Sequence, residues 1–375
     1  MKTRILLIVL LCFLLLGCSG KNISAPETEE PTSGLPTPVT DPLSSLVNNM
    51  TTEELVGQLF LVHYPGQEAA LAAIEQYHIG NFILFGANTK NNTPEGLTAE
   101  LANLQTNTPI PLLIAVDEEG GTVTRISGYG QYRNEPFPAP RQLYQEGGLE
   151  LVLETEREKS QLLLSLGINV NLAPVCDITT DSRAFMYSRS LGASPEETGE
   201  YVAAMVNLAA SEGIGSVLKH FPGYGNNVDT HIGTAVDGRT LAELEERDLV
   251  PFRAGIEAGA KAIMVSHTII NAIDPELPAS LSPKVLDYLR DDMGFDGVII
   301  TDDLTMDAIA DVYGSGEAAV LAVIAGADLL CCSDYELQYQ AVLQAVQDGR
   351  ISTAQLMKSV MRIVQWKDSL GLIEK

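Results

Sequence analysis

The feature that most constrains the fold of this chain is a repeated alternation of short apolar stretches with helix-like ones. Eight apolar stretches, rich in β-branched residues, have the length and composition of buried strands: 59–63, 79–85, 111–117, 168–175, 216–220, 262–267, 297–302 and 328–332. Helix-like segments lie between them, at 94–107, 149–166, 195–213, 240–259, 283–293, 316–326 and 334–348, with 352–370 after the last. Apolar strands that alternate with helices are typical of a parallel sheet covered by helices. We therefore predict a (β/α)8 TIM barrel, with residues 43–375 as a single domain.

Charged and polar side chains follow five of the predicted strands at the point where each strand ends. They are Asp117, Asp177, Lys219-His220, Ser266-His267 and Asp302-Asp303. One such residue could simply mark where solvent begins. In a parallel barrel, however, all carboxyl ends lie on one face, where active sites are built. The sequence therefore predicts that these groups converge on one pocket.

The amino-terminal residues have the layout of a secretory signal. A basic start is followed by an apolar run, 5–16, which is too short to span a membrane. Leu15-Leu16-Gly17-Cys18 resembles the bacterial lipoprotein box, which implies cleavage after residue 17 and a lipid on Cys18. A plain signal with an incidental cysteine is the alternative. We expect residues 18–42, rich in Pro, Ser, Thr and Glu, to form a flexible tether that holds the domain outside the cell membrane.

Charge and cysteine content exclude several classes of function. The formal net charge is −26, and loss of Lys2 and Arg4 with the signal makes it −28. Such a charge argues against nucleic acid as a partner. The three remaining cysteines, Cys176, Cys331 and Cys332, lie in apolar stretches and have neither zinc-site nor disulfide-framework spacing. No nucleotide-binding fingerprint is present, so we predict neither a metal nor an organic cofactor.

The stretch 215–231 carries the strongest signal for chemistry. It begins as an apolar strand, reaches Lys219 and His220, and continues as a Gly/Pro/Asn loop to Asp229-Thr230-His231. A carboxylate two residues from an imidazole can orient it and raise its basicity, which is a recurring acid/base device. An exposed polar pair on a loop is the alternative.

Four motifs together resemble glycoside hydrolase family 3, and most closely its bacterial β-N-acetylglucosaminidases of the NagZ type. They are KHFPG at 219–223, Asp229-Thr230-His231, DEEGG at 117–121 and TDDLTM at 301–306. The resemblance covers about residues 45–370 and implies retaining hydrolysis in two steps. Asp302 would form the covalent glycosyl intermediate, with Asp303 as the rival nucleophile. His231, paired with Asp229, would be the general acid and base.

The resemblance also implies a set of sugar-binding residues. They are Asp117, Arg125, Arg189, Lys219 and His220. Either arginine could instead form a structural ion pair. We expect Asp177 and His267 to face the same pocket, and either could contact the sugar directly or support the residues that do. Tyr224, Glu118, Thr122 and a shortened spacer at 226–228 depart from the commoner family pattern, which affects the expected loop geometry and substrate preference.

The implied activity is exo-hydrolysis of terminal β-linked GlcNAc from peptidoglycan, its muropeptide fragments or a related glycan. A β-glucosidase and a phosphorylase that uses phosphate in place of water remain as alternatives. A non-catalytic sugar-binding lipoprotein is the competing class.

Overall fold

A computed structural model describes residues 41–373 except 226–234, and a strand lies within each of the eight predicted stretches. These strands are β1 (Phe60–His63), β2 (Asn81–Leu84), β3 (Leu113–Val116), β4 (Val170–Asn171), β5 (Gly215–Ser216) with β6 (Leu218–Phe221), β8 (Ala262–Val265), β10 (Val298–Thr301) and β11 (Leu330–Cys332). Nearly all of their residues are buried, as continuously apolar strands require.

The strands are parallel neighbours in a continuous order. One sheet runs β11-β1-β2-β3-β4-β5 and another runs β10-β8-β6. The two sheets meet at both edges, because Val175 bridges Lys219 beside β4 and Ile300 of β10 bridges Leu329 beside β11. The order therefore returns to its starting strand, which confirms the predicted parallel barrel.

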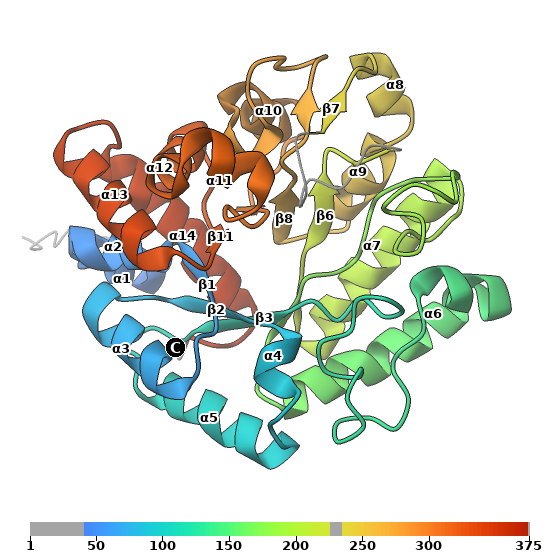
Figure 1. Ribbon diagram of the computed structural model, residues 1–375, viewed down its shortest axis with the longest axis horizontal. Coiled ribbons are helices and arrows are strands. Elements are labelled where there is room, and N and C mark those ends of the chain that lie inside the picture. The colour runs from blue at the N-terminus through green and yellow to red at the C-terminus, as the bar shows by residue number, and fades with distance from the viewer. Residues whose placement is uncertain (1–40, 226–234, 374–375) are drawn as a thin grey trace, which may run out of the picture. The chain divides into compact units, whose positions relative to one another are not determined.

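Helices surround these strands (Figure 1). They are α1 (Pro42–Asn48), α2 (Thr52–Gln58), α3 (Gln67–Tyr77), α4 (Gly86–Thr89), α5 (Pro94–Thr106), α6 (Pro140–Ser165), α7 (Pro195–Glu212), α8 (Leu241–Glu246), α9 (Leu249–Glu257), α10 (Pro283–Asp287), α11 (Asp307–Tyr313), α12 (Ser315–Ala325), α13 (Tyr335–Gln347) and α14 (Thr353–Ser369). Each predicted helical segment contains a helix, and α1, α2, α3, α4 and α11 are additional. Two short strands, β7 (Val236–Asp237) and β9 (Ile269–Ile270), pair outside the barrel.

Local sequence signals fix the helix ends, as α7 illustrates. Ser194 and Glu197 form a reciprocal capping box at its start, where Pro195 takes the first helical position. The helix ends at Gly213, whose φ of 77° suits glycine. These signals set the length of α7 and deliver the chain into β5.

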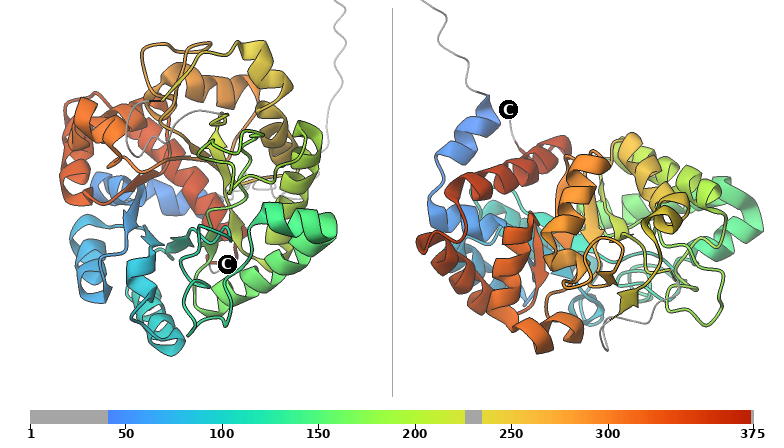
Figure 2. Two further views of the ribbon diagram at one scale, coloured as in Figure 1. Left: turned by 45° about the vertical axis from the view of Figure 1, so that its right-hand side comes forward. Right: turned by 90° about the horizontal axis from the view of Figure 1, so that it is seen from above.

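Helices α1 and α2 pack beside α14, so the two ends of the described region lie together (Figure 2). Lys367 of α14 is buried in this region and donates to Gln58 Oε1 at 2.9 Å and to Gly80 O at 3.1 Å. Burial lowers the pKa of Lys367 to about 7. Near neutral pH the Lys367 amine can therefore be buried in its uncharged form, in which it still donates two hydrogen bonds.

Within the described ranges, no single helix has the length and apolar character needed to cross a membrane. The bent pair α11 and α12 meets that requirement by length and composition only.

Candidate active site

A cavity of about 530 Å³ opens at the carboxyl ends of the strands. Its lining includes six residues predicted from the sequence: Asp117, Arg125, Arg189, Lys219, His220 and Asp302. Asp303, Tyr224, Phe185 and Cys331 also line it. Residues that are up to 185 positions apart in the sequence thus meet at the face where barrel enzymes carry their active sites.

A network of alternating charges lies at one side of this cavity. Lys219 Nζ lies 2.6 Å from Asp117 Oδ1 and 2.7 Å from Glu119 Oε1. Arg189 donates to both oxygens of Glu119, at 2.9 and 2.7 Å. Burial alone would raise the pKa of Glu119, but the charges of Lys219 and Arg189 more than offset this and lower the pKa. Each cation is therefore held by the same buried carboxylate.

The network continues through His220. Its Nε2 lies 3.2 Å from Arg189 Nη2, and its Nδ1 lies 2.8 Å from Asp177 Oδ2. Asp177 also accepts from the backbone N–H of Tyr224, at 2.7 Å. Asp177 is buried and outside the cavity lining, so it orients His220 and Tyr224 from behind.

The two adjacent aspartates after β10 have different surroundings. Asp303 Oδ1 accepts from the N–H and the hydroxyl of Thr305, at 2.9 and 2.7 Å, and Oδ2 lies 2.8 Å from His63 Nε2. Burial would raise the pKa of Asp303, but these contacts lower it. His267 is buried behind the pair, with Nε2 2.9 Å from the Asp303 carbonyl oxygen. Both aspartates line the cavity, and Asp303 in addition stabilises the turn through these contacts.

Arg125 and Arg189 differ in how they are held. Arg189 forms an ion pair with Glu119 and also lines the cavity. It therefore combines the two roles considered from the sequence, a structural ion pair and a position from which it can contact sugar. Arg125 forms no ion pair with any residue the structure describes, and its buried Nε has no hydrogen-bond partner there. Its backbone N–H donates to Glu118 Oε2 at 2.7 Å. The buried Glu118 therefore orders the loop that carries Arg125.

Three predicted residues fall outside the described ranges. Asp229 and His231 belong to 226–234, and Cys18 precedes residue 41. The described flanks of 226–234 are both buried: Gly225 follows the cavity-lining Tyr224, and Ala235 O accepts from Ile269 N at 2.9 Å.

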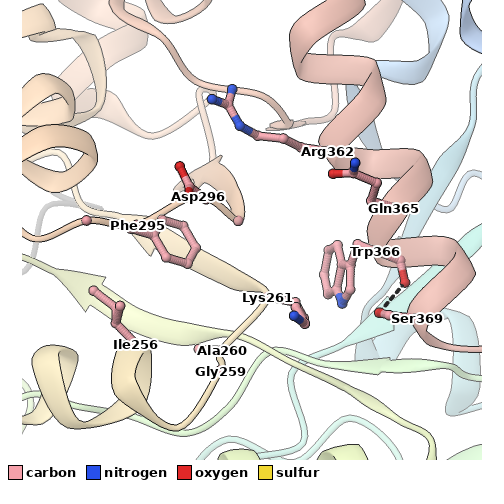
Figure 3. A pocket seen from close by; sticks show the side chains of 12 residues that line it. Ile256, Gly259, Ala260, Lys261, Phe295, Asp296, Arg362, Gln365, Trp366 and Ser369 are labelled. Carbon is pink, nitrogen blue, oxygen red and sulfur yellow. Dashed lines mark hydrogen bonds between the residues drawn. The ribbon is translucent and has the colours of Figure 1, made fainter. Parts of the chain in front are cut away.

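A second cavity, of about 340 Å³, lies at the opposite ends of the strands. Figure 3 shows its lining, which joins the residues just before β8 and β10 to α9 and to Arg362, Gln365, Trp366 and Ser369 of α14. None of the predicted site residues is among them. Active sites of barrels do not lie at this end, so the first cavity is the candidate active site.

Comparison with known proteins identifies the family. The profile of the glycosyl hydrolase family 3 N-terminal domain matches residues 51–366. The chain belongs to this family. The family 3 chain is 35% identical over 290 residues to a protein of Stenotrophomonas maltophilia named beta-hexosaminidase, a match that covers 76% of this chain and 84% of that protein. It is 31% identical to beta-hexosaminidase LpqI of Mycobacterium tuberculosis, covering 85% and 83%.

Solved structures give the same family. A family 3 beta-N-acetylglucosaminidase from Paenibacillus sp. str. FPU-7 matches with a TM-score of 0.81 and 34% identity, over 87% of this family 3 chain. The chain spans 64% of that protein. The structure of M. tuberculosis LpqI matches with a TM-score of 0.79 and 28% identity, covering 87% and 96%.

Glu119 and His63 contact residues of the site but were not predicted as site residues from the sequence. Glu119 stands two residues after Asp117 in an Asp-Glu-Glu-Gly-Gly turn and has no signal of its own there. His63 ends the first of the predicted strands. A signal for His63 was present in the sequence. Like Asp117 and Asp302, which end the third and seventh predicted strands, it is a polar residue at the end of an apolar run.

Proposed function

We propose that this chain is a retaining exo-β-N-acetylhexosaminidase that removes terminal GlcNAc from peptidoglycan or its fragments. The observation that carries the proposal is the convergence of Asp302 with Asp117, Arg189, Lys219 and His220 around one cavity at the carboxyl face of the barrel. Relatives named beta-hexosaminidase and beta-N-acetylglucosaminidase support the sugar class.

The proposed chemistry has two steps with Asp302 as nucleophile. In the first, the Asp302 carboxylate forms a bond to the anomeric carbon as the bond from that carbon to the glycosidic oxygen breaks, and the departing oxygen takes a proton from His231. In the second, His231 takes a proton from water, which attacks the same carbon and breaks the bond to Asp302. Asp229 holds the imidazole in the required tautomer. The assignment of Asp302 over Asp303 is supported by the contacts that Asp303 makes with Thr305 and His63.

Sugar binding is assigned to the charge network and to Arg125. The Asp117 carboxylate can accept from two neighbouring hydroxyl groups, and Lys219 and His220 can donate to hydroxyls of the same ring. Arg125 has a buried Nε without a hydrogen-bond partner in the described part of the chain, which suits a donor reserved for ligand. Lys219 and Arg189 are held by Glu119, so they need little rearrangement when sugar binds.

The decisive experiment compares Asp302→Asn with Asp311→Asn on an aryl β-GlcNAc substrate. Asp311 is exposed on α11 and serves as a matched control. We expect Asp302→Asn to lose at least about 1000-fold in kcat, about 4 kcal/mol, and the control to retain wild-type activity. A fluorinated glycoside that slows the second step should label Asp302. Activity within about tenfold of wild type would remove Asp302 as nucleophile.

The same assay separates the other candidate activities. A panel of aryl GlcNAc, glucose, xylose and GalNAc substrates, each with and without phosphate, distinguishes a hexosaminidase from a glucosidase or phosphorylase. Tight binding of unchanged chitobiose, without turnover of any substrate, would instead identify a sugar-binding protein.

We further propose attachment to the outer side of the cell membrane through a lipid on Cys18. The lipoprotein-like 15–18 segment and the tether composition of 18–42 support this. Metabolic labelling with palmitate should mark the wild-type chain and not Cys18→Ser, which should leave the membrane fraction. Retention of the label in Cys18→Ser would refute the assignment.

A further inference from the structure

Three side chains of different chemistry meet beside the cavity, at the ends of neighbouring strands, and two of them, Asp303 and Cys331, line it. His63 ends β1, Cys331 lies in β11, and Asp303 follows β10, which bridges the residue before β11. One ligand atom from each (an imidazole nitrogen, a carboxylate oxygen and the sulfur) lies within 4.8 Å of the others. An imidazole, a carboxylate and a thiol grouped in this way are a donor set for a transition-metal ion.

The spacing of these atoms suits a tetrahedral ion after small movements. Zn²⁺, with bonds of about 2.0 to 2.3 Å, holds its ligand atoms roughly 3.3 to 3.6 Å apart. His63 Nε2 and Asp303 Oδ2, now 2.8 Å apart, would separate slightly, and the sulfur would approach them. These two atoms are close, but Nε2 is counted without a hydrogen-bond partner among the described residues. A cation between them would improve both contacts.

The supporting contacts already hold the three groups in place. The His63 ring lies 4.3 Å from the ring of Phe85, centroid to centroid. Asp303 Oδ1 is fixed by Thr305, which leaves Oδ2 directed toward His63. Cys331 is only 3% exposed but lines the cavity, so an ion has a path to its sulfur. The fourth position is then open to water or ligand from the cavity.

We propose that His63, Asp303 and Cys331 form a binding site for a soft divalent cation, Zn²⁺ or Cd²⁺, that inhibits the enzyme when it is occupied. Binding deprotonates the Cys331 thiol and any protonated His63, and the protons pass to the buffer. The thiolate selects soft ions over Mg²⁺ and Ca²⁺, which prefer oxygen ligands.

Inhibition follows from the position of Asp303 next to Asp302, and this part rests on the proposed function. A divalent charge on Asp303 stabilises the carboxylate of Asp302 and so reduces its tendency to attack carbon. It also narrows the cavity where the sugar ring would lie.

The binding test uses Cd²⁺ and the full chain, and it does not depend on enzyme activity. Cadmium bound to a thiolate gives a charge-transfer band in the ultraviolet. We expect the wild type to gain this band on titration, Cys331→Ser to gain none, and the matched control Cys332→Ser on the same strand to match the wild type. His63→Gln should weaken Cd²⁺ binding at least about tenfold while keeping Cys331. A band that persists unchanged in Cys331→Ser would overturn the site.

The activity test measures an inhibition constant for Zn²⁺. For each variant, the rate at each Zn²⁺ concentration is divided by that variant's own rate without metal. Cys331→Ser and His63→Gln should each raise this constant at least about tenfold, whereas Cys332→Ser should leave it unchanged. Equal inhibition of wild type and Cys331→Ser would place the inhibitory ion elsewhere and overturn the assignment. If the wild type shows the Cd²⁺ band but has no hydrolase activity, the metal site is supported and the proposed function is rejected. Failure of the metal site and failure of the proposed function therefore give different results.

Discussion

Replacement of Glu119 by glutamine tests whether one buried carboxylate holds the cations of the site. Glu119 is 2% exposed and makes three short contacts, two with Arg189 and one with Lys219. Glutamine has the same shape, but its amide nitrogen would face the Arg189 Nε–H, donor against donor. One charge-assisted hydrogen bond is lost and two are weakened, at about 1.5 to 3 kcal/mol for each full bond.

We therefore expect Glu119→Gln to lower the free energy of unfolding by about 3 to 5 kcal/mol, as for other buried pairs from which one partner is removed. At about 2 °C per kcal/mol for a chain of this size, Tm falls by about 6 to 10 °C. KM for aryl β-GlcNAc should rise as well, because Lys219 and Arg189 lose their fixed positions. Urea unfolding at pH 7 and steady-state kinetics measure the two effects.

The pH dependence gives an independent check on the same residue. The folded-state pKa of Glu119 is lowered, so its contribution to stability is present above the unfolded value and is lost as pH falls below it. The difference between wild type and Glu119→Gln should shrink by about 1.4 kcal/mol per pH unit below about pH 4.3.

The matched control for Glu119→Gln is Glu158→Gln, which removes an exposed ion pair with Arg133. It should cost less than about 1 kcal/mol. If Glu119→Gln costs no more than Glu158→Gln, the buried network does not hold the site as described.

Two further predictions concern the packing of the barrel. Because burial lowers the pKa of Lys367 to about 7, the unfolded chain binds a proton between about pH 7 and 10.4 that the folded chain does not, and stability rises with pH there. Urea unfolding of the wild type should gain about 2 to 3 kcal/mol from pH 7 to 9 relative to Lys367→Met, and equal slopes would contradict this. Gly57→Ala should lower Tm, since its Cβ would lie 2.3 Å from Tyr77 O, at a cost of about 1 to 3 kcal/mol. Gly130→Ala, with nothing within 4 Å, is its control and should be neutral; equal losses would show that the α2 contact is not tight.

The barrel was predictable because its strands are buried on both sides and so are apolar without interruption. The stretch 297–303 illustrates this, since an aliphatic run is followed by Thr301 and then by two aspartates, Asp302 and Asp303. Helices α1 and α3 were not predicted. Short segments such as 42–48 mix serines with few apolar residues, and their helical state depends on packing, here of α1 against α14.

That the strand-end residues lie at one face was predictable from topology alone. Which of them form ion pairs with which partners was not. Parallel strands place their ends together whatever their sequence, so Asp117, Lys219 and Asp302 could be assigned to one face. That Glu119 lies under Lys219 and Arg189 depends on how the 118–127 loop folds back. Nothing in the local sequence separates this buried glutamate from the equally buried Glu118, which binds backbone N–H groups instead.

The alternation of charge beneath the cavity has a consequence for the kind of molecule that it can hold. Apart from Arg125, the cationic groups here are already paired: Lys219 and Arg189 each face Glu119, and Asp117 adds a further negative group, so this wall has little positive charge left to offer an anion. It presents directed hydrogen-bond donors and acceptors, which suit the hydroxyl groups of an uncharged ring. Any acidic part of a larger substrate would be repelled by a chain with a formal charge of −26 and would extend outward into solvent.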